Sequence, residues 1–378
     1  MAARFKLHAQ PRLDFGLGSY SELPRFLSPF EKIVIVCGSQ TILNSGRLKE
    51  LSRQLPSSLI IPTRSSEPTL KDVDLLTTTL RSHDPDAIVA IGGGSTIDLA
   101  KASAVLVNNP NGDQVLAYLE GIGEGLTLKE PGIPLFAVPT TAGTGAEATI
   151  NAVIASPEHG VKKSLRSSLL MPLHIVIDPE LQMTCPKQIT IDSGMDAITQ
   201  CFESYISCRA NEFTRPLALQ GFKMGWKHIE TAVDQPMNNE ARSAMACCAY
   251  FSGVALANSG LGLAHGIAAA LGVTAEISHG RACSILLPFA AKFNASHCRS
   301  AYSSLSNAIG MQPATDLPKR IERLSKRLGV SNNFSELGIG VHELPDLVER
   351  SYGNSMQGNP VLPTPDQLVS ALTEYYYQ

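Results

Sequence analysis

A glycine-rich segment that links an apolar run to a helical pattern constrains the fold of this chain most. Residues 89–101 read Val-Ala-Ile-Gly-Gly-Gly-Ser-Thr-Ile-Asp-Leu-Ala-Lys, so three glycines follow a run typical of a buried parallel strand. Glycine lets the backbone approach an anion closely, and a helix that begins near Ser95 directs N–H groups and its positive dipole end to the same place. The segment therefore predicts a strand, a phosphate-binding turn and a helix with Asp98 and Lys101 on one side; an ordinary strand-to-helix turn is the alternative.

Apolar runs of strand length alternate with helix-length stretches through the first half of the chain. The runs that we expect to be strands are residues 32–37, 58–61, 87–91, 135–138 and 175–177. Helices are expected over residues 69–82 and 96–107. This alternation is typical of a parallel sheet covered by helices, which binds ligands at the carboxyl ends of its strands.

The second half of the chain has a different pattern. After Asp178-Pro179, long segments with helical periodicity dominate, including residues 241–258 and 260–271. A chain of 378 residues is also long enough for two domains of about 180 residues each. We therefore predict an α/β dinucleotide-binding domain with a Rossmann-like parallel sheet over residues 1–182, and an all-α domain for metal and substrate over residues 183–378.

Charge, hydropathy and cysteine content exclude several classes of protein. The net charge is -3 and only 17% of the residues are charged, so no nucleic-acid partner is expected. No apolar run reaches the roughly 18 residues of a membrane span, and residues 1–12 lack the apolar core of a signal peptide. The eight cysteines contain no C-x-x-C pair, and we interpret them as reduced packing residues. These features predict a cytoplasmic protein that does not bind membranes.

A second glycine-rich segment ends another predicted strand. Residues 138–149 read Val-Pro-Thr-Thr-Ala-Gly-Thr-Gly-Ala-Glu-Ala-Thr, which offers hydroxyl groups and backbone donors. Alone it would predict a turn. Beside the first glycine loop it becomes a candidate for the other side of a dinucleotide site.

Asp196, His265 and His279 form a candidate metal site in the helical half. Asp196 and Gln200 are four residues apart and share a helix face, while the two histidines lie in glycine-flanked segments. One carboxylate and two imidazoles suit a divalent transition metal with an open position that can polarise a carbonyl. Taken singly, each histidine is more often a packed, hydrogen-bonded residue.

Together these segments resemble the iron-containing, or group III, alcohol dehydrogenase superfamily. The similarity runs from residues 15–19 through residues 92–101, 139–149, 178–181 and 265–279 to Asn359-Pro360. The resemblance implies a dehydroquinate synthase-like fold and hydride transfer between a nicotinamide cofactor and an aldehyde, ketone or alcohol beside Fe²⁺ or Zn²⁺. It also leads us to expect a homodimer.

The resemblance assigns roles residue by residue. The residues expected to contact the cofactor are Gly38, Ser39, Gly93, Gly94, Ser95, Asp98, Thr140, Thr141, Thr144, Thr149, Lys162 and Leu181. Asp196, His265 and His279 match three of the family's four metal ligands and are the expected catalytic residues. Gln200 is the fourth candidate, either as a weak ligand or as a partner of a ligand.

Two positions depart from the family pattern. Gln200 stands where the family has its fourth metal-binding histidine, and Ala269 replaces a further histidine of the helical domain. An amide oxygen is a weaker donor than an imidazole for Fe²⁺ or Zn²⁺. Three alternatives to a metal-assisted alcohol dehydrogenase therefore stay open: a metal-free carbonyl reductase similar to maleylacetate reductases, a dehydroquinate synthase-like lyase that uses NAD transiently, and a non-catalytic dinucleotide-binding protein.

The turn after the first strand of the dinucleotide domain bears on the choice of cofactor. It reads Cys37-Gly38-Ser39-Gln40 and has no carboxylate that would accept from the ribose 2′-OH and repel a 2′-phosphate. We expect Gly38 to leave room there and Ser39 to offer a donor. The prediction is a preference for NADPH, with NADH as the alternative, and hence reduction as the direction of the reaction.

Overall fold

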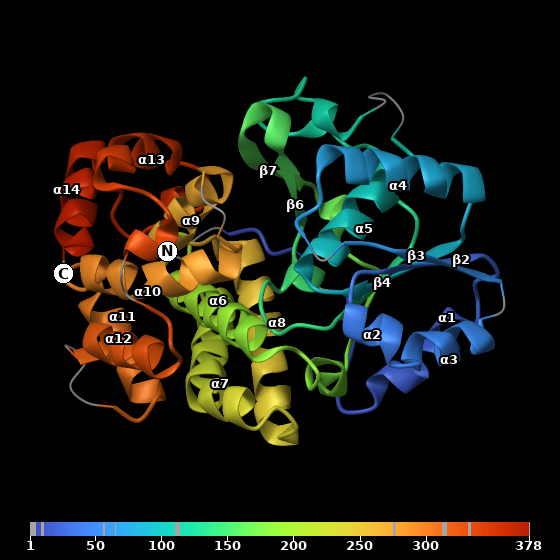
Figure 1. Ribbon diagram of the computed structural model, residues 1–378, viewed down its shortest axis with the longest axis horizontal. Coiled ribbons are helices and arrows are strands. Elements are labelled where there is room, and N and C mark those ends of the chain that lie inside the picture. Colours follow the sequence, from blue (N-terminus) through green and yellow to red (C-terminus); the bar gives the residue numbers. More distant parts are fainter. Residues whose placement is uncertain are drawn as a thin grey trace. The chain divides into compact units, whose positions relative to one another are not determined.

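The computed structural model describes residues 5–8, 11–55, 57–64, 66–109, 114–274, 277–311, 316–331 and 334–377. They form two compact units (Figure 1). An α/β unit joins His8–Pro186 with Pro236–Ala246, and a helical unit joins residues 5–7, Lys187–Gln235 and Cys247–Gln378. Unlike the predicted domains 1–182 and 183–378, these units are not continuous stretches of chain, because residues 236–246 fold with the α/β unit.

The α/β unit is built on a parallel sheet of six strands in the order β1-β8-β5-β4-β2-β3. The strands are β1 (Arg12–Phe15), β2 (Ile33–Cys37), β3 (Ser58–Pro62), β4 (Ala87–Gly92), β5 (Leu135–Pro139) and β8 (His174–Ile177). The predicted α/β class and parallel sheet are confirmed. Strand β1 was missed because its sequence, Arg-Leu-Asp-Phe, contains no apolar run.

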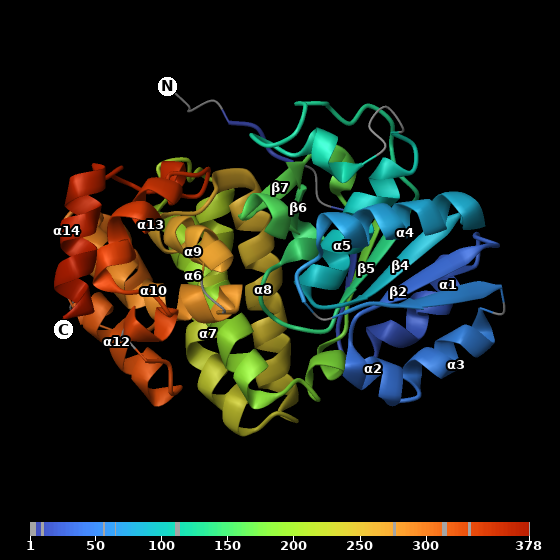
Figure 2. The same cartoon turned by 45° about the horizontal axis from the view of Figure 1, so that its top comes forward.

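Alternate residues of the central strands supply two apolar cores, one on each face of the sheet. Val34 and Ile88 belong to one core, whereas Ile35 and Val89 belong to the other. The first face is covered by α4 (Leu70–His83) and α5 (Gly94–Leu106), and the second by α1 (Leu23–Leu27), α2 (Gln40–Asn44) and α3 (Arg47–Gln54) (Figure 2). Because both faces are buried, the strands are apolar throughout, as the sequence indicated.

The order of the strands creates a switch point between β2 and β4. After β2 the chain adds β3 on one side, and after β4 it adds β5 on the other. Ligands of open α/β sheets bind beside the carboxyl ends of two strands related in this way. Here these ends are held together, since the N–H of Gly38 donates to the carbonyl of Ile91 at 3.1 Å. A hairpin of β6 (Asn151–Ser156) and β7 (Val161–Arg166) follows the loop after β5.

The second half of the chain is helical, as predicted. Its helices are α6 (Lys187–Ile206), α7 (Thr214–Asp234), α8 (Asn239–Ser259), α9 (Leu263–Thr274), α10 (His279–Asn294), α11 (Arg299–Ala308), α12 (Leu317–Arg327), α13 (Leu344–Arg350) and α14 (Pro365–Tyr376). Helices α6 and α7 pack closely, because a Cβ at Gly225 would lie only 2.6 Å from Ile198 Cγ1. Within the described residues no single helix is long and apolar enough to cross a membrane; α8 with residues 263–271 meets that test as a pair bent by 96°.

Candidate active site

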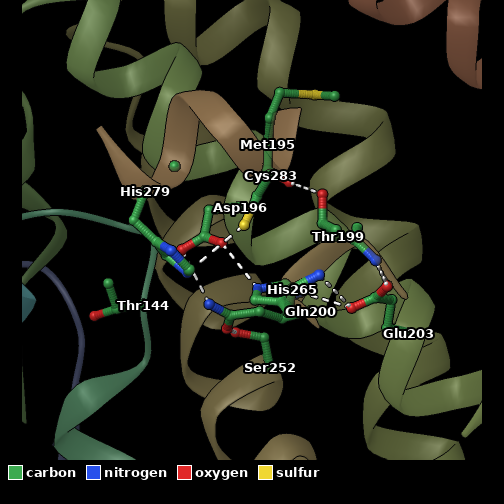
Figure 3. A network of polar contacts seen from close by, with 12 residues as sticks. Thr144, Met195, Asp196, Thr199, Gln200, Glu203, Ser252, His265, His279 and Cys283 are labelled. Carbon is green, nitrogen blue, oxygen red and sulfur yellow. Dashed lines mark hydrogen bonds and ion pairs between the residues drawn. The ribbon is translucent and has the colours of Figure 1, made fainter. Parts of the chain in front are cut away.

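Four side chains that can bind a metal ion meet in the helical unit (Figure 3). Helix α6 supplies Asp196, α9 supplies His265, and α10 supplies His279 and Cys283, which are four residues apart on one helix face. One ligand atom of each residue lies within 4.8 Å of the others. Nε2 of His265 is 3.2 Å from Oδ1 of Asp196, and Sγ of Cys283 is 3.6 Å from Nε2 of His279. His279 is partly exposed, and the other three are buried.

Glu203 holds His265 in place from the side opposite Asp196. Its fully buried carboxylate lies 2.7 Å from Nδ1 of His265 and accepts from the N–H groups of Gly262 and Ala264, at the start of α9. A carboxylate at Nδ1 selects the tautomer whose Nε2 is free to bind a metal. Glu203 therefore orients one ligand and caps the helix that carries it.

Gln200 connects Asp196 with Ser252. Its Nε2 donates to Oδ2 of Asp196 at 3.0 Å, and its Oε1 accepts from the hydroxyl of Ser252 at 2.7 Å. The reverse orientation of the amide would set two oxygen atoms 3.0 Å apart. This geometry supports the expectation that Gln200 is a partner of a ligand.

The side chains of the site shift one another's pKa values. Burial lowers the pKa of His265, but the electrostatic interaction with Cys283 and hydrogen bonds to Asp196 and Glu203 raise it well above its ordinary value. The electrostatic interaction with Cys283 also raises the pKa of His279 to about 9. Burial raises the pKa of Asp196, yet the hydrogen bond from His265 and the positive charge of His279 lower it overall. The nitrogen, oxygen and sulfur donors of the site fit Fe²⁺ or Zn²⁺.

Sequence reasoning missed two members of this network. Cys283 was assigned to packing with the other cysteines, although it lies four residues after His279 in a helical segment. Glu203 is seven residues after Asp196 and so on the same face of α6. The signal that could have found both residues is helical spacing from a predicted ligand.

The two glycine-rich loops lie side by side in the α/β unit. The N–H of Thr140 donates to the carbonyl of Gly92 at 2.9 Å. A Cβ at Gly94 would lie 2.4 Å from Oγ1 of Thr144, so only glycine fits there without a shift. Helix α5 begins at Gly94, which leaves the N–H groups of Gly94 and Ser95 without intrahelical acceptors. The loops thus provide the backbone donors that a pyrophosphate requires.

Lys101 fixes the second glycine-rich loop from within the protein. Its buried Nζ donates to the carbonyls of Ala146, Thr149 and Asn151 and to the hydroxyl of Thr149, at distances of 2.5 to 2.9 Å. Asp98 lies 3.8 Å from this ammonium group and accepts from a backbone N–H of β6. Burial lowers the pKa of Lys101 to about 8 and raises that of Asp98 to about 6. Asp98 and Thr149, expected to contact the cofactor, here bind protein groups that shape the loop.

The other predicted cofactor residues have different surroundings. A Cβ at Gly38 would lie 1.9 Å from Oγ1 of Thr96, so this glycine accommodates Thr96, and the expectation that it leaves room for a phosphate stays a prediction. Ser39 caps α2 by accepting from the N–H of residue 42. Lys162 forms an ion pair with residue 67, and Leu181 is buried in the second core. Gly93 and Thr141 face each other across the two loops, with a Cβ at residue 93 placed 3.4 Å from Oγ1 of Thr141.

Family models, related sequences and a solved structure that resemble this chain are described as alcohol dehydrogenases. The family described as "Iron-containing alcohol dehydrogenase" matches residues 11–179, and "Fe-containing alcohol dehydrogenase family, C-terminal" matches residues 190–376. The chain is 30% identical over 368 residues to an NAD-dependent methanol dehydrogenase from Bacillus methanolicus, covering 94% of this chain and 95% of that protein. It is 32% identical to the probable alcohol dehydrogenase EutG of Escherichia coli, over 79% of this chain and 75% of that protein. The structure of an alcohol dehydrogenase from Oenococcus oeni superposes with a TM-score of 0.90 at 27% identity, covering 99% of this chain and all of that one.

Proposed function

Because the chain belongs to the iron-containing alcohol dehydrogenase family, we propose that it reduces an aldehyde or ketone to the alcohol with NADPH as the hydride donor. The reaction adds a hydride to the carbonyl carbon and a proton to the oxygen. The observation that carries the proposal is the cluster of Asp196, His265, His279 and Cys283, which combines the donors of a catalytic metal site in one buried place. The enzyme class and the involvement of a metal and a nicotinamide follow from the family, whereas the choice of NADPH is our own inference.

Each part of the chain has a defined task in this reaction. Asp196, His265 and His279 would hold the metal, which when bound supplies a Lewis acid that polarises the substrate carbonyl. Glu203 keeps Nε2 of His265 directed at the site. His279, the partly exposed member, marks the side from which a substrate can approach.

The glycine-rich loops would bind the cofactor. The N–H groups of Gly94 and Ser95 at the start of α5 would donate to the pyrophosphate, and the hydroxyls of Thr141 and Thr144 stand on the neighbouring loop. The preference for NADPH rests on the turn around Ser39, which carries no carboxylate to repel a 2′-phosphate.

A panel of aldehydes and ketones, followed by the absorbance of NADPH and of NADH at equal concentration, tests the proposal. We expect turnover with at least one carbonyl compound and a higher rate with NADPH. A preference for NADH of about tenfold, or about 1.4 kcal/mol, would contradict the cofactor assignment. If no carbonyl compound or alcohol reacts with either cofactor, the lyase and the binding protein become the better interpretations.

A further inference from the structure

This inference rests on the proposed function and concerns the identity of the fourth metal ligand. We infer that Cys283 is the fourth protein ligand of the metal centre, and that Gln200 orients Asp196 without touching the metal. The protein would then hold its metal with one carboxylate, two imidazoles and one thiolate. A ligand from α10 thereby replaces the one that the family pattern places on α6.

The position of Cys283 is that of a ligand. It follows His279 by four residues on α10, so both side chains leave the same face of the helix toward Asp196 and His265. Ligand atoms around one tetrahedral ion lie roughly 3.3 to 3.8 Å apart when the metal–ligand distances are about 2.0 to 2.3 Å. The separations of 3.6 Å between Cys283 Sγ and His279 Nε2, and of 3.2 Å between His265 Nε2 and Asp196 Oδ1, are close to this range.

The position of Gln200 is that of a supporting residue. Its N–H group, which cannot bind a metal, is the part that faces Asp196, and its oxygen faces Ser252. Binding through the oxygen would require the amide to turn and would leave Asp196 without this donor. A hydrogen-bonded carboxylate is held in one orientation, and such support contributes to the affinity of metal sites.

The donor set has a chemical consequence. A thiolate is softer than an imidazole or an amide oxygen and favours Zn²⁺ over Fe²⁺. Binding of the ion displaces the thiol proton of Cys283 to solvent, because only the deprotonated sulfur is a ligand. We therefore expect this protein to bind Zn²⁺ more tightly than Fe²⁺, although its family is described as iron-containing.

X-ray absorption spectroscopy of the full chain loaded with Zn²⁺ tests the assignment without reference to activity. The wild type and Gln200→Leu should both show a sulfur neighbour at about 2.3 Å together with nitrogen and oxygen neighbours at about 2.0 to 2.2 Å. Cys283→Ser and Cys283→Ala should lose the sulfur neighbour. The matched control is Cys298→Ala, which removes a buried cysteine outside the cluster and should leave the spectrum unchanged.

Competition with a chromophoric chelator gives the Zn²⁺ affinities of the same proteins. We expect Gln200→Leu to weaken binding about 10- to 100-fold, as the loss of a supporting residue does, and Cys283→Ala to weaken it more. A wild-type spectrum with nitrogen and oxygen neighbours alone overturns the inference and leaves the proposed function intact. Failure of the wild type to bind Zn²⁺, Co²⁺ or Fe²⁺ overturns the inference and also the role of a metal in the proposed function. Circular dichroism of each variant shows whether it has folded.

Discussion

Replacing Glu203 by glutamine tests how the helical unit prepares its metal site. In the structure Oε1 accepts one N–H, from Ala264 at 2.6 Å. Oε2 accepts from the N–H groups of Gly262 at 3.0 Å and His265 at 3.4 Å, and it lies 2.7 Å from Nδ1 of His265. A glutamine keeps only one acceptor oxygen, so its best orientation places that oxygen at the Oε2 position and its NH₂ group against the N–H of Ala264.

The contacts of Glu203 allow an estimate of the loss of folding stability and of the loss of metal affinity. One hydrogen bond to a charged, buried acceptor disappears and a donor is left unpaired, which corresponds to a lower free energy of unfolding by about 1 to 3 kcal/mol. The neutral amide also polarises His265 less than the carboxylate of Glu203 does. Substitutions of this kind weaken metal binding about 10- to 100-fold, or about 1.4 to 2.7 kcal/mol.

Two measurements separate these effects. Urea unfolding of the metal-free protein gives the change in the free energy of unfolding, and chelator competition gives the change in Zn²⁺ affinity. Glu230→Gln is the matched control, because Glu230 pairs with Arg327 at the surface and should alter neither quantity appreciably. A Zn²⁺ affinity of Glu203→Gln within about twofold of the wild type would refute the role assigned to this carboxylate.

Three further predictions concern the α/β unit. Lys101→Met removes the buried ammonium group that donates to three carbonyls and lies beside Asp98, so it should lower the free energy of unfolding by about 3 to 5 kcal/mol. Met in place of the exposed Lys71 should not lower it, and equal urea midpoints for the two variants would contradict this prediction. Gly92→Ala places a Cβ 2.7 Å from Cβ of Thr96 and should lower the free energy of unfolding by about 1 to 3 kcal/mol, which a thermal scan would detect. Gly353→Ala is the control, because the space around that residue is open. Ser39→Asp adds a carboxylate at the turn after β2 and should shift the ratio of kcat/KM values from NADPH toward NADH; an unchanged ratio would place the 2′-phosphate elsewhere.

The sheet could be predicted from the sequence because its strands are buried on both faces. Continuous apolar runs such as Ile33–Cys37 and Ala87–Gly92 stand out against their surroundings. Strand β1 and the hairpin β6–β7 have mixed sequences, since their burial patterns include exposed or half-buried positions. Strand β1 also pairs with β8, which is distant in the sequence, whereas β6 and β7 pair with each other across a short turn.

The candidate site was predictable only where a residue type is informative by itself. Asp196, His265 and His279 were found because carboxylates and imidazoles in apolar or glycine-flanked segments are unusual. Cys283 was missed because a cysteine in an apolar helix is an ordinary packing residue. The closeness of Gly38 to Thr96 could not be predicted either, since it depends on how α5 returns over β2 and β4.

The measurement that tests the account most directly is turnover of the wild type before and after removal of metal by a strong chelator, with His279→Ala alongside. We expect activity to fall by orders of magnitude on chelation, to return with Zn²⁺ or Fe²⁺, and to stay low in His279→Ala although that variant binds NADPH with wild-type affinity. Activity that survives both chelation and the His279→Ala substitution would contradict the account and identify the protein as a metal-free carbonyl reductase.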